Sequence, residues 1–177
     1  MTLEFGQPLG GICQFAYAVE DIERSARDFT EQLGVGPWFV RGPFQPPEGR
    51  YRGQPTHATF TLARGFTGHV MVELVKQHDD SPSVYNENGG WRYGFHHWAV
   101  FPADFDAALT DYLDRGNVEA FSDRLPSGSR VVYVDMKGEL PGMIELVEHT
   151  EAQEAVYTKI WRASLDWDGS ELLRHEG

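Results

Sequence analysis

The chain has 177 residues, of which 41% are hydrophobic and 13% aromatic, and its formal net charge is −12. This composition suits a globular domain with a sizeable core and excludes a disordered chain. The acidic balance, without a clustered basic patch, argues against nucleic acid as a partner. The sequence shows neither the roughly 18-residue apolar run of a membrane span nor a secretory signal, so we expect no membrane partner. A single cysteine, Cys13, suits a reducing compartment, and we expect a cytoplasmic protein.

The first half reads as strand, helix, strand, strand, strand. Residues 12–19 have strand composition, and a helix follows over 21–34, with Asp21 as its N-cap candidate and Gly34 as its stop signal. An extended segment over 37–44 and a Gly/Pro-rich loop over 44–55 precede two strands, 56–64 and 68–77, joined by a Gly-containing turn. The loop region carries Arg41, Arg50 and Arg52, which indicate either a solvated loop or a cap that holds an anionic substrate group.

The second half repeats this order. A strand, a helix with Asp104 as its cap candidate and a Gly stop occupy 96–117, and extended segments follow over 118–125, 129–138 and 142–150. The first strands and helices of the halves align at an offset of 83 residues, and MVELV aligns with MIELV at an offset of 72. Two copies of one unit favour two modules that face each other rather than a solenoid.

We therefore predict an α+β fold of two tandem βαβββ modules, residues 10–78 and 92–150, forming a curved mixed sheet around a metal-binding cleft. Residues 151–177 form a C-terminal amphipathic helix and tail. Apolar residues of that helix, including Val156, Ile160 and Trp161, cover either a sheet edge within the chain or a partner chain.

Four polar side chains interrupt apolar strands at repeat-related positions: Gln14 and His97 in the first strands, Glu73 and Glu145 in the last. Taken singly, each is more often structural, but buried carboxylates are normally paired, protonated or metal-bound. Alternation turns Gln14 and His97 toward the cleft and His96 away from it, toward the helix layer or the rim, where it has a structural role. Three oxygens and one imidazole suit a divalent ion such as Zn, Ni, Co, Mn or Fe. We expect His97→Ala to abolish metal binding and His96→Ala to spare it.

This repeat, with a ligand-type residue in each first strand and ELV in each last strand, resembles the vicinal oxygen chelate superfamily. That group includes glyoxalase I, bleomycin-resistance proteins and extradiol dioxygenases, and the resemblance covers residues 10–150. It implies metal ligands at Gln14, Glu73, His97 and Glu145, a set similar to that of some glyoxalase I enzymes. Methylmalonyl-CoA epimerases more often have His first and Gln second, extradiol dioxygenases use two His and one Glu around iron, and bleomycin-resistance proteins lack the metal set. No glutathione site is recognisable.

The resemblance implies a divalent-metal-dependent lyase or isomerase of the glyoxalase I type. A substrate with vicinal oxygens chelates the metal, and a proton shifts through an enediolate or enolate intermediate. Glu145 is the expected base, with Glu73 facing it across the metal, and a positioned base contributes about 10²–10⁴-fold. The alternatives are a metal-dependent epimerase of an acyl thioester, a non-enzymatic small-molecule-binding protein, and an Fe(II) ring-cleaving dioxygenase.

Substrate contacts are expected from both halves. In strand 56–64, alternation favours His57, Thr59 and Thr61 facing the cleft, with Ala58, Phe60 and Leu62 under the helices; a rim position for His57 is equally compatible. Tyr133 is the matching residue of the second half. Trp38, Phe39 and Phe44 line an apolar pocket, or pack in the core in the case of Phe39. We expect a small-molecule substrate and a homodimer.

Overall fold

The computed structural model describes residues 1–87, 89–138 and 140–176. Its helices are α1 (Ile22–Leu33), α2 (Phe105–Asp114) and α3 (Glu151–Ser164). Its strands are β1 (Ile12–Ala18), β2 (Trp38–Phe44), β3 (Arg50–Tyr51), β4 (Gln54–Pro55), β5 (Phe60–Thr67), β6 (Val70–Gln77), β7 (Asn86–Glu87), β8 (Gly90–Trp91), β9 (Gly94–Val100), β10 (Val118–Arg124), β11 (Arg130–Asp135), β12 (Met143–Val147) and β13 (Leu173–His175).

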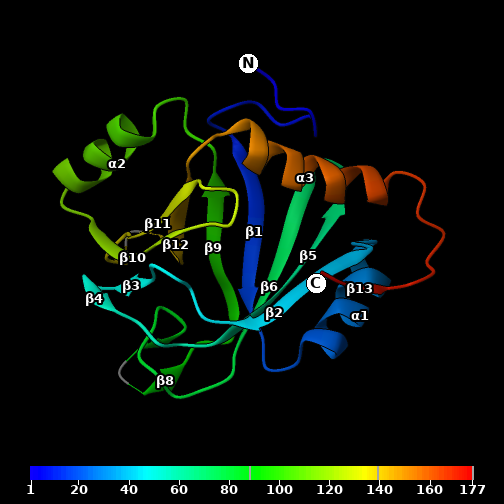
Figure 1. Ribbon diagram of the computed structural model, residues 1–177, viewed down its shortest axis with the longest axis horizontal. Helices are drawn as coiled ribbons and strands as arrows, with labels where there is room; N and C mark the ends of the chain where they lie inside the picture. The colour runs from blue at the N-terminus through cyan, green and yellow to red at the C-terminus, as the bar shows by residue number, and fades with distance from the viewer. Residues whose placement is uncertain (88, 139, 177) are drawn as a thin grey trace.

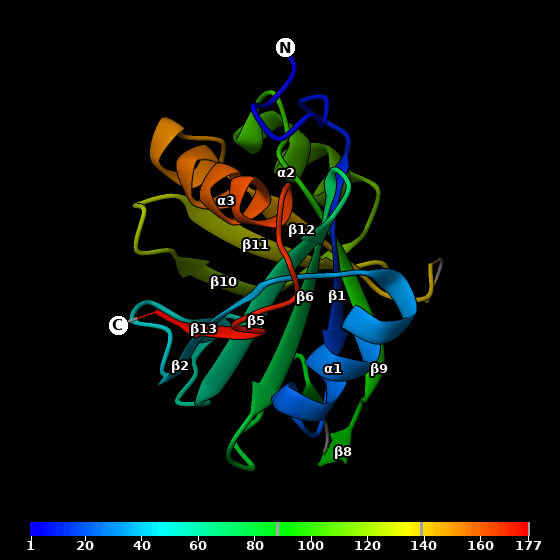
Figure 2. The same cartoon turned by 90° about the vertical axis from the view of Figure 1, so that its right-hand side faces the viewer.

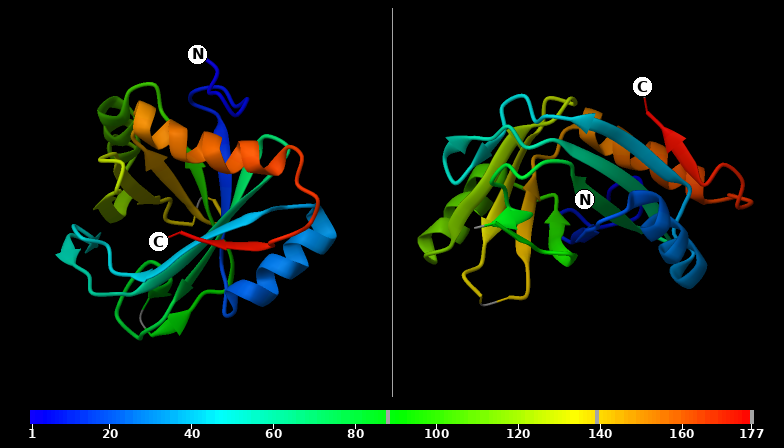
Figure 3. Two further views of the ribbon diagram at one scale, coloured as in Figure 1. Left: turned by 45° about the vertical axis from the view of Figure 1, so that its right-hand side comes forward. Right: turned by 90° about the horizontal axis from the view of Figure 1, so that it is seen from below.

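One curved mixed sheet dominates the described part of the chain (Figures 1 and 3). Its 11 strands lie in the order β13-β2-β5-β6-β1-β9-β12-β11-β10-β3-β4, and β7 and β8 form a separate two-stranded sheet. The predicted α+β fold with a curved mixed sheet is confirmed. None of the helices in the described ranges combines the length and apolar content that a bilayer crossing requires.

The internal repeat is visible in the strand pairing. Strand β1 is parallel to β6 as β9 is parallel to β12, and β1 and β9 pair antiparallel at the centre of the sheet. Ala16 lies opposite Glu73 in the first half, and Ala99 lies opposite Glu145 in the second. These pairs differ by the same offsets, 83 and 72, that align the two halves of the sequence.

The helix termini follow from local sequence. Asp21 accepts a hydrogen bond from the backbone N–H of Arg24 at 2.9 Å, and Asp104 accepts one from Ala107 at 2.9 Å. Gly34 ends α1 with a φ of +66°, in the left-handed region that favours glycine. Helices α1 and α2 cover the outer face of the sheet, where they bury apolar residues of their own halves. The inner face is therefore left for the cleft.

The C-terminal helix packs within the chain. Figures 1 and 2 show α3 crossing the inner face of the sheet, where Tyr157 and Ile160 are buried in the core. The following segment then adds β13 beside β2, in parallel, a strand that the sequence did not predict. Trp167 of this segment packs against Gly36, where a Cβ atom would lie 2.4 Å from the indole ring.

The loop predicted over 44–55 contains the short strands β3 and β4. Strand β3 pairs with β10, so a segment of the first half joins the sheet edge of the second half. Two-residue strands leave no periodic pattern in a sequence, which is why composition alone predicted a loop.

Candidate metal site and pocket

The four predicted ligand residues converge at the centre of the sheet. Gln14, Glu73, His97 and Glu145 lie on the adjacent strands β1, β6, β9 and β12. All four side chains are buried, with exposed fractions between 0% for His97 and 7% for Glu145. Two carboxyl groups, an amide and an imidazole therefore share one water-poor space.

His97 lies close to all three other residues of this cluster. Its Nε2 atom lies 3.2 Å from Glu145 Oε2, 3.4 Å from Gln14 Nε2 and 3.9 Å from Glu73 Oε1. Gln14 also donates from Nε2 to Glu145 Oε2 at 3.2 Å, while its Oε1 accepts from the Tyr157 hydroxyl at 2.9 Å. Helix α3 thus orients the amide of β1 through Tyr157.

Two alanines make room for the cluster. Ala16 pairs with both Glu73 and His97, and Ala99 pairs with both Gln14 and Glu145. Directly paired residues share a face of the sheet, so each fully buried alanine separates two of the polar residues. A larger side chain at either position would occupy the space into which the four side chains point.

Each first strand bulges at the residue before its ligand. The β1–β9 register shifts between Ile12 and Gln14 and again between Ala16 and Tyr17, which leaves Cys13 and His96 as the extra residues. A bulge breaks the alternation of side chains. The predicted separation of the two histidine rings on opposite faces is therefore wrong: His96 is 6% exposed, and its Nδ1 lies 2.9 Å from Nδ1 of His97.

The histidine pair fixes the position of the ring protons. His96 Nε2 lies 3.0 Å from the carbonyl oxygen of Val84, so it carries the proton and its Nδ1 is an acceptor. His97 must then donate from Nδ1, which leaves its Nε2 lone pair directed at the cluster. Burial lowers the pKa of His96 to about 3 and that of His97 to about 4, so both rings are neutral. A neutral imidazole held in this tautomer is the form that binds a metal.

Burial has the opposite effect on the two carboxyl groups. It raises the pKa of Glu73 to about 7, with a further contribution from the negative charge of Glu145. Burial likewise raises the pKa of Glu145 to about 8, although a hydrogen bond from Tyr133 and the charge of Arg64 oppose it. The cluster therefore retains protons near neutral pH, where a cation could take their place.

The donor chemistry fits a divalent ion, with one change at Gln14. In the described part of the chain, no three His, Cys, Asp or Glu side chains form a complete metal-binding group. The amide of Gln14 turns its NH₂ group, which cannot coordinate, toward His97. Turning the amide over would present its oxygen, and the Tyr157 hydroxyl, which can accept as well as donate, could still pair with it. Glu73, His97 and Glu145 carry ligand-type atoms without such an exchange, but in the described structure they are not arranged as a metal-binding group.

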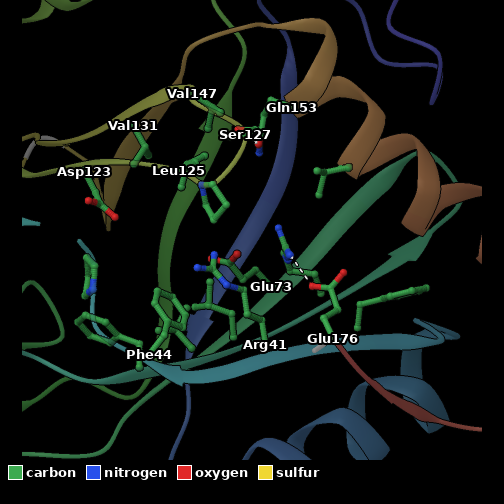
Figure 4. Close-up of a pocket in the computed structure, with 18 of the residues that line it drawn as sticks. Arg41, Phe44, Glu73, Asp123, Leu125, Ser127, Val131, Val147, Gln153 and Glu176 are labelled. Atoms are coloured by element: carbon green, nitrogen blue, oxygen red, sulfur yellow. Dashed lines mark hydrogen bonds and ion pairs between the residues drawn. The ribbon is translucent and has the colours of Figure 1, made fainter. Parts of the chain in front are cut away.

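The cluster opens into a cavity of about 600 Å³. Glu73 and Glu145 line it together with Tyr85 and Tyr133, and the Tyr133 ring packs on His97 at 4.5 Å between centroids. Residues of both halves and of α3 form the walls, as Figure 4 shows for Phe44, Val147 and Gln153. This volume is typical of a site for a small molecule.

Only some of the predicted substrate residues line the cavity. Tyr133 lines the cavity, whereas Trp38 is fully buried beneath α1 and donates from its indole nitrogen to Thr30. The placement of Trp38 in the pocket is therefore wrong, because it faces the outer layer, while its neighbours Phe39 and Phe44 do line the cavity.

The face predicted for the strand after the loop is also wrong. Phe60 and Leu62 line the cavity, whereas His57 is exposed and Thr59 receives a hydrogen bond from Gln45 near the surface. The correct face could have been inferred from the hairpin turn at Gly68 and His69. A two-residue turn there pairs Thr67 with Val70, and counting back along both strands pairs Arg64 with Glu73. Residues opposite each other share a face, so Arg64, Leu62 and Phe60 belong with Glu73.

Sequence reasoning missed several polar residues of the site. Arg64 and Tyr133 occupy equivalent positions, opposite Glu73 and Glu145 respectively, but only Tyr133 was predicted. Tyr85 lies near the end of a segment without periodic pattern, and its hydroxyl is 3.2 Å from that of Tyr133. Tyr157, Lys159 and Glu176 reach the cavity from the C-terminal region through packing that no local pattern reveals.

Comparison with known proteins agrees with this architecture. The family model of the Glyoxalase/Bleomycin resistance protein/Dioxygenase superfamily matches residues 13–133, and the chain belongs to this superfamily. No curated protein matches the sequence.

Solved structures show the same fold at low identity. Methylmalonyl-CoA epimerase from Mycobacterium tuberculosis aligns with a TM-score of 0.53 and 18% identity, over 83% of this chain and 93% of that one. A hypothetical protein from Bacillus halodurans C-125 aligns with a TM-score of 0.54 and 15% identity, over 80% and 95%. A methylmalonyl-CoA epimerase in complex with methylmalonyl-CoA and NH4+ aligns with a TM-score of 0.52 and 19% identity, over 82% and 98%.

Proposed function

We propose that this protein is a divalent-metal-dependent isomerase or lyase that moves a proton at a carbon beside a carbonyl group of a small molecule. The observation that carries the proposal is the pair of buried carboxyl groups, Glu73 and Glu145, that line one cavity on either side of His97. Membership of the superfamily supports a metal-dependent enzyme in general.

Gln14, Glu73, His97 and Glu145 would hold the ion. When bound, the metal supplies Lewis acidity that polarises a carbonyl oxygen and stabilises the negative charge left by proton removal. The protein's part is to keep the Nε2 lone pair of His97 free, through the hydrogen bond from His97 to His96, and to exclude water by burial.

Glu145 is the proposed base. Burial raises its pKa to about 8 in the metal-free protein, and a bound cation would lower that pKa, so that the carboxylate form is available to take a proton and return it. Glu73 has a pKa of about 7 and lies on the other side of the imidazole, so it can return the proton at a second position or face. This two-carboxylate arrangement suits either isomerisation or epimerisation. Because the fold is shared with methylmalonyl-CoA epimerases, the substrate panel includes acyl thioesters.

The test measures metal and proton transfer separately. Metal content of the purified protein is determined first, followed by titration with Mn²⁺, Co²⁺, Ni²⁺ and Zn²⁺. Exchange of the carbon-bound proton is then followed by NMR in D₂O for 2-oxo compounds and acyl thioesters. We expect Glu145→Gln to retain metal and to lose exchange by at least about 10²-fold. Glu151→Gln, at an exposed position of α3, is the matched control and should behave as wild type.

Three results would contradict the proposal. If no ion binds and Glu73→Ala and His97→Ala change nothing, the cavity belongs to a metal-free binding protein. If Fe²⁺ together with oxygen uptake accompanies turnover, the protein is a dioxygenase. If Glu145→Gln exchanges protons at the wild-type rate, another group is the base.

A further inference from the structure

A cluster of cationic side chains borders the cavity at the edge that β13 forms. This is unusual in a chain with a net charge of −12. The cavity lining includes four such residues on this side: Arg41, Arg64, Lys159 and Arg174. They come from β2, β5, α3 and β13, so the tertiary fold rather than a local sequence run brings them together.

One carboxylate, that of Glu176, occupies the space between these cations. Its Oε2 lies 3.1 Å from Nη2 of Arg64, and its Oε1 lies 3.5 Å from Nζ of Lys159. Glu176 is held there by the strand that precedes it, since its backbone N–H donates to Val40 at 2.8 Å. Figure 4 shows the Glu176 side chain pointing into the cavity, with the ion pair drawn as a dashed line.

Three of the four cations lie over aromatic rings. Lys159 and Arg174 both lie over the ring of Phe39, at 5.2 and 5.8 Å from its centroid, and Arg41 lies over Phe44 at 4.1 Å. Such cation–π contacts fix a charged group without neutralising it. The pKa of Arg41 is lowered, chiefly by burial and then by the charge of Arg64, although Glu176 and Asp123 oppose this effect.

Hydrogen-bonding capacity is left over at this position. The Arg64 side chain is only 12% exposed, and its Nε atom is buried without a hydrogen-bond partner in the described structure. Nε of Arg174 likewise makes no hydrogen bond, but it lies 3.9 Å from Oε2 of Glu171, and the Arg174 side chain is 33% exposed. A buried guanidinium with unmet donors is costly, so the cluster has a strong demand for acceptor oxygens. Asp123, on the opposite wall, already accepts a hydrogen bond from the backbone of Glu48 at 3.0 Å.

The cluster is adjacent to the candidate metal site. Arg64 lies directly opposite Glu73 in the β5–β6 pairing, on the same face of the sheet, and both side chains line the cavity. Cβ atoms of such pairs are about 5 Å apart. A single small molecule can therefore contact Arg64 and the Glu73–His97–Glu145 cluster at the same time.

We propose that these cations form a carboxylate-binding subsite, in which Glu176 is an internal stand-in that the carboxylate of a small-molecule ligand replaces. The inference deepens the proposed function and rests on it for the substrate class: a molecule whose carboxylate lies a few atoms from the reacting carbonyl. A carboxylate is favoured over other anions because the present occupant is one, with each of its oxygens facing a different cation.

Ligand exchange with Glu176 can be measured without knowing the substrate. The probes are butyrate, its neutral analogue butyramide and inorganic phosphate, titrated by calorimetry at constant ionic strength. In wild type, butyrate can bind only during the fraction of time in which the Glu176 carboxylate has left the subsite, and its apparent affinity is reduced to that fraction. Glu176→Gln should therefore bind butyrate at least about tenfold more tightly than wild type. Glu31→Gln, which alters the net charge equally on the exposed side of α1, should leave the affinity unchanged.

Second variants make the test independent of folding. Arg64→Gln combined with Glu176→Gln should lose the gain in butyrate affinity that Glu176→Gln shows alone. If that double variant does not fold, Lys159→Gln combined with Glu176→Gln should reduce the gain, and the Lys159 side chain is 64% exposed, so its replacement disturbs little packing. Equal butyrate affinity in wild type and Glu176→Gln, or an equal gain for butyramide, would overturn the proposal. Tighter binding of phosphate than of butyrate would overturn the assignment to carboxylates. Titrations in EDTA and in Mn²⁺ separate this result from the proposed function. The subsite proposal requires that Glu176→Gln gain butyrate affinity under both conditions. The enzyme proposal fails if the protein binds no metal, whatever the butyrate affinity.

Discussion

Replacing His96 tests whether the histidine pair prepares the site for a metal. His96→Phe removes the Nδ1 acceptor while keeping an aromatic ring beside Tyr85, whose centroid lies 4.2 Å from that of His96. The Nδ1–H of His97, now 2.9 Å from its acceptor, would then be buried without one. The ring can relieve this by moving its proton to Nε2, where Glu145 lies at 3.2 Å.

The expected loss of affinity follows from that change of tautomer. A metal needs the Nε2 lone pair, so binding must return the proton to Nδ1 and leave that donor unsatisfied. An unsatisfied buried donor costs about 1–3 kcal/mol. Since about 1.4 kcal/mol corresponds to a factor of ten, metal affinity should fall about 5- to 150-fold. This overlaps the roughly 10- to 100-fold effect typical of groups that orient metal ligands.

The assay is calorimetric titration with Co²⁺ or Mn²⁺, combined with ¹⁵N NMR of the His97 ring to identify its tautomer. His96→Asn, whose side-chain oxygen can replace the Nδ1 acceptor, should bind metal within a few-fold of wild type. The reasoning is refuted if His96→Phe binds metal as wild type does, or if His97 keeps its proton on Nδ1 in that variant. This revises the expectation from sequence that His96→Ala spares metal binding.

Two further predictions concern the same cluster. The folded pKa values of Glu73 and Glu145, about 7 and 8, exceed the ordinary value of 4.5, so the metal-free protein has this contribution to stability in full below about pH 4.5 and loses it as the pH rises through 7 to 8. The lowered pKa values of His96 and His97 have the opposite effect, which is complete near pH 6.5, so the comparison starts there. Urea denaturation in EDTA should therefore give a lower free energy of unfolding at pH 8.5 than at pH 6.5, with Glu145→Gln weakening the trend; a rise would contradict it. Ala16→Val should place a methyl pair between Glu73 and His97, cost about 1–3 kcal/mol of stability and abolish metal binding, while binding at wild-type affinity would show that the alanine is not needed for space.

Much of the site could be predicted because it follows from a repeat. Gln14 and His97 are related by the 83-residue offset that aligns the first strands of the two halves, and Glu73 and Glu145 by the 72-residue offset that aligns the last strands. The four positions could therefore be identified from the sequence repeat. Helix caps at Asp21 and Asp104 were equally local and were confirmed.

The errors arose where tertiary geometry overrides a local rule. Alternation predicted that His96 faces away from His97, but a bulge places the two rings in contact. Alternation from Thr59 gave the wrong face for β5, since the strand begins only at Phe60 and its face is set by pairing with β6. The contribution of Glu176 depends on a three-residue strand at the sheet edge, which has no periodicity to detect.

The difference between Arg64 and Tyr133 affects how a ligand can be oriented in the cavity. A cavity made from two identical halves would present the same groups to a ligand in either of two orientations related by a half-turn. Here a guanidinium stands opposite Glu73 and a phenol stands opposite Glu145, so the two orientations are unequal in energy. One polypeptide containing both halves can therefore bind an asymmetric molecule in one preferred orientation, so that Glu73 and Glu145 each meet the same part of the ligand every time, whereas two identical half-length chains would offer two equivalent orientations.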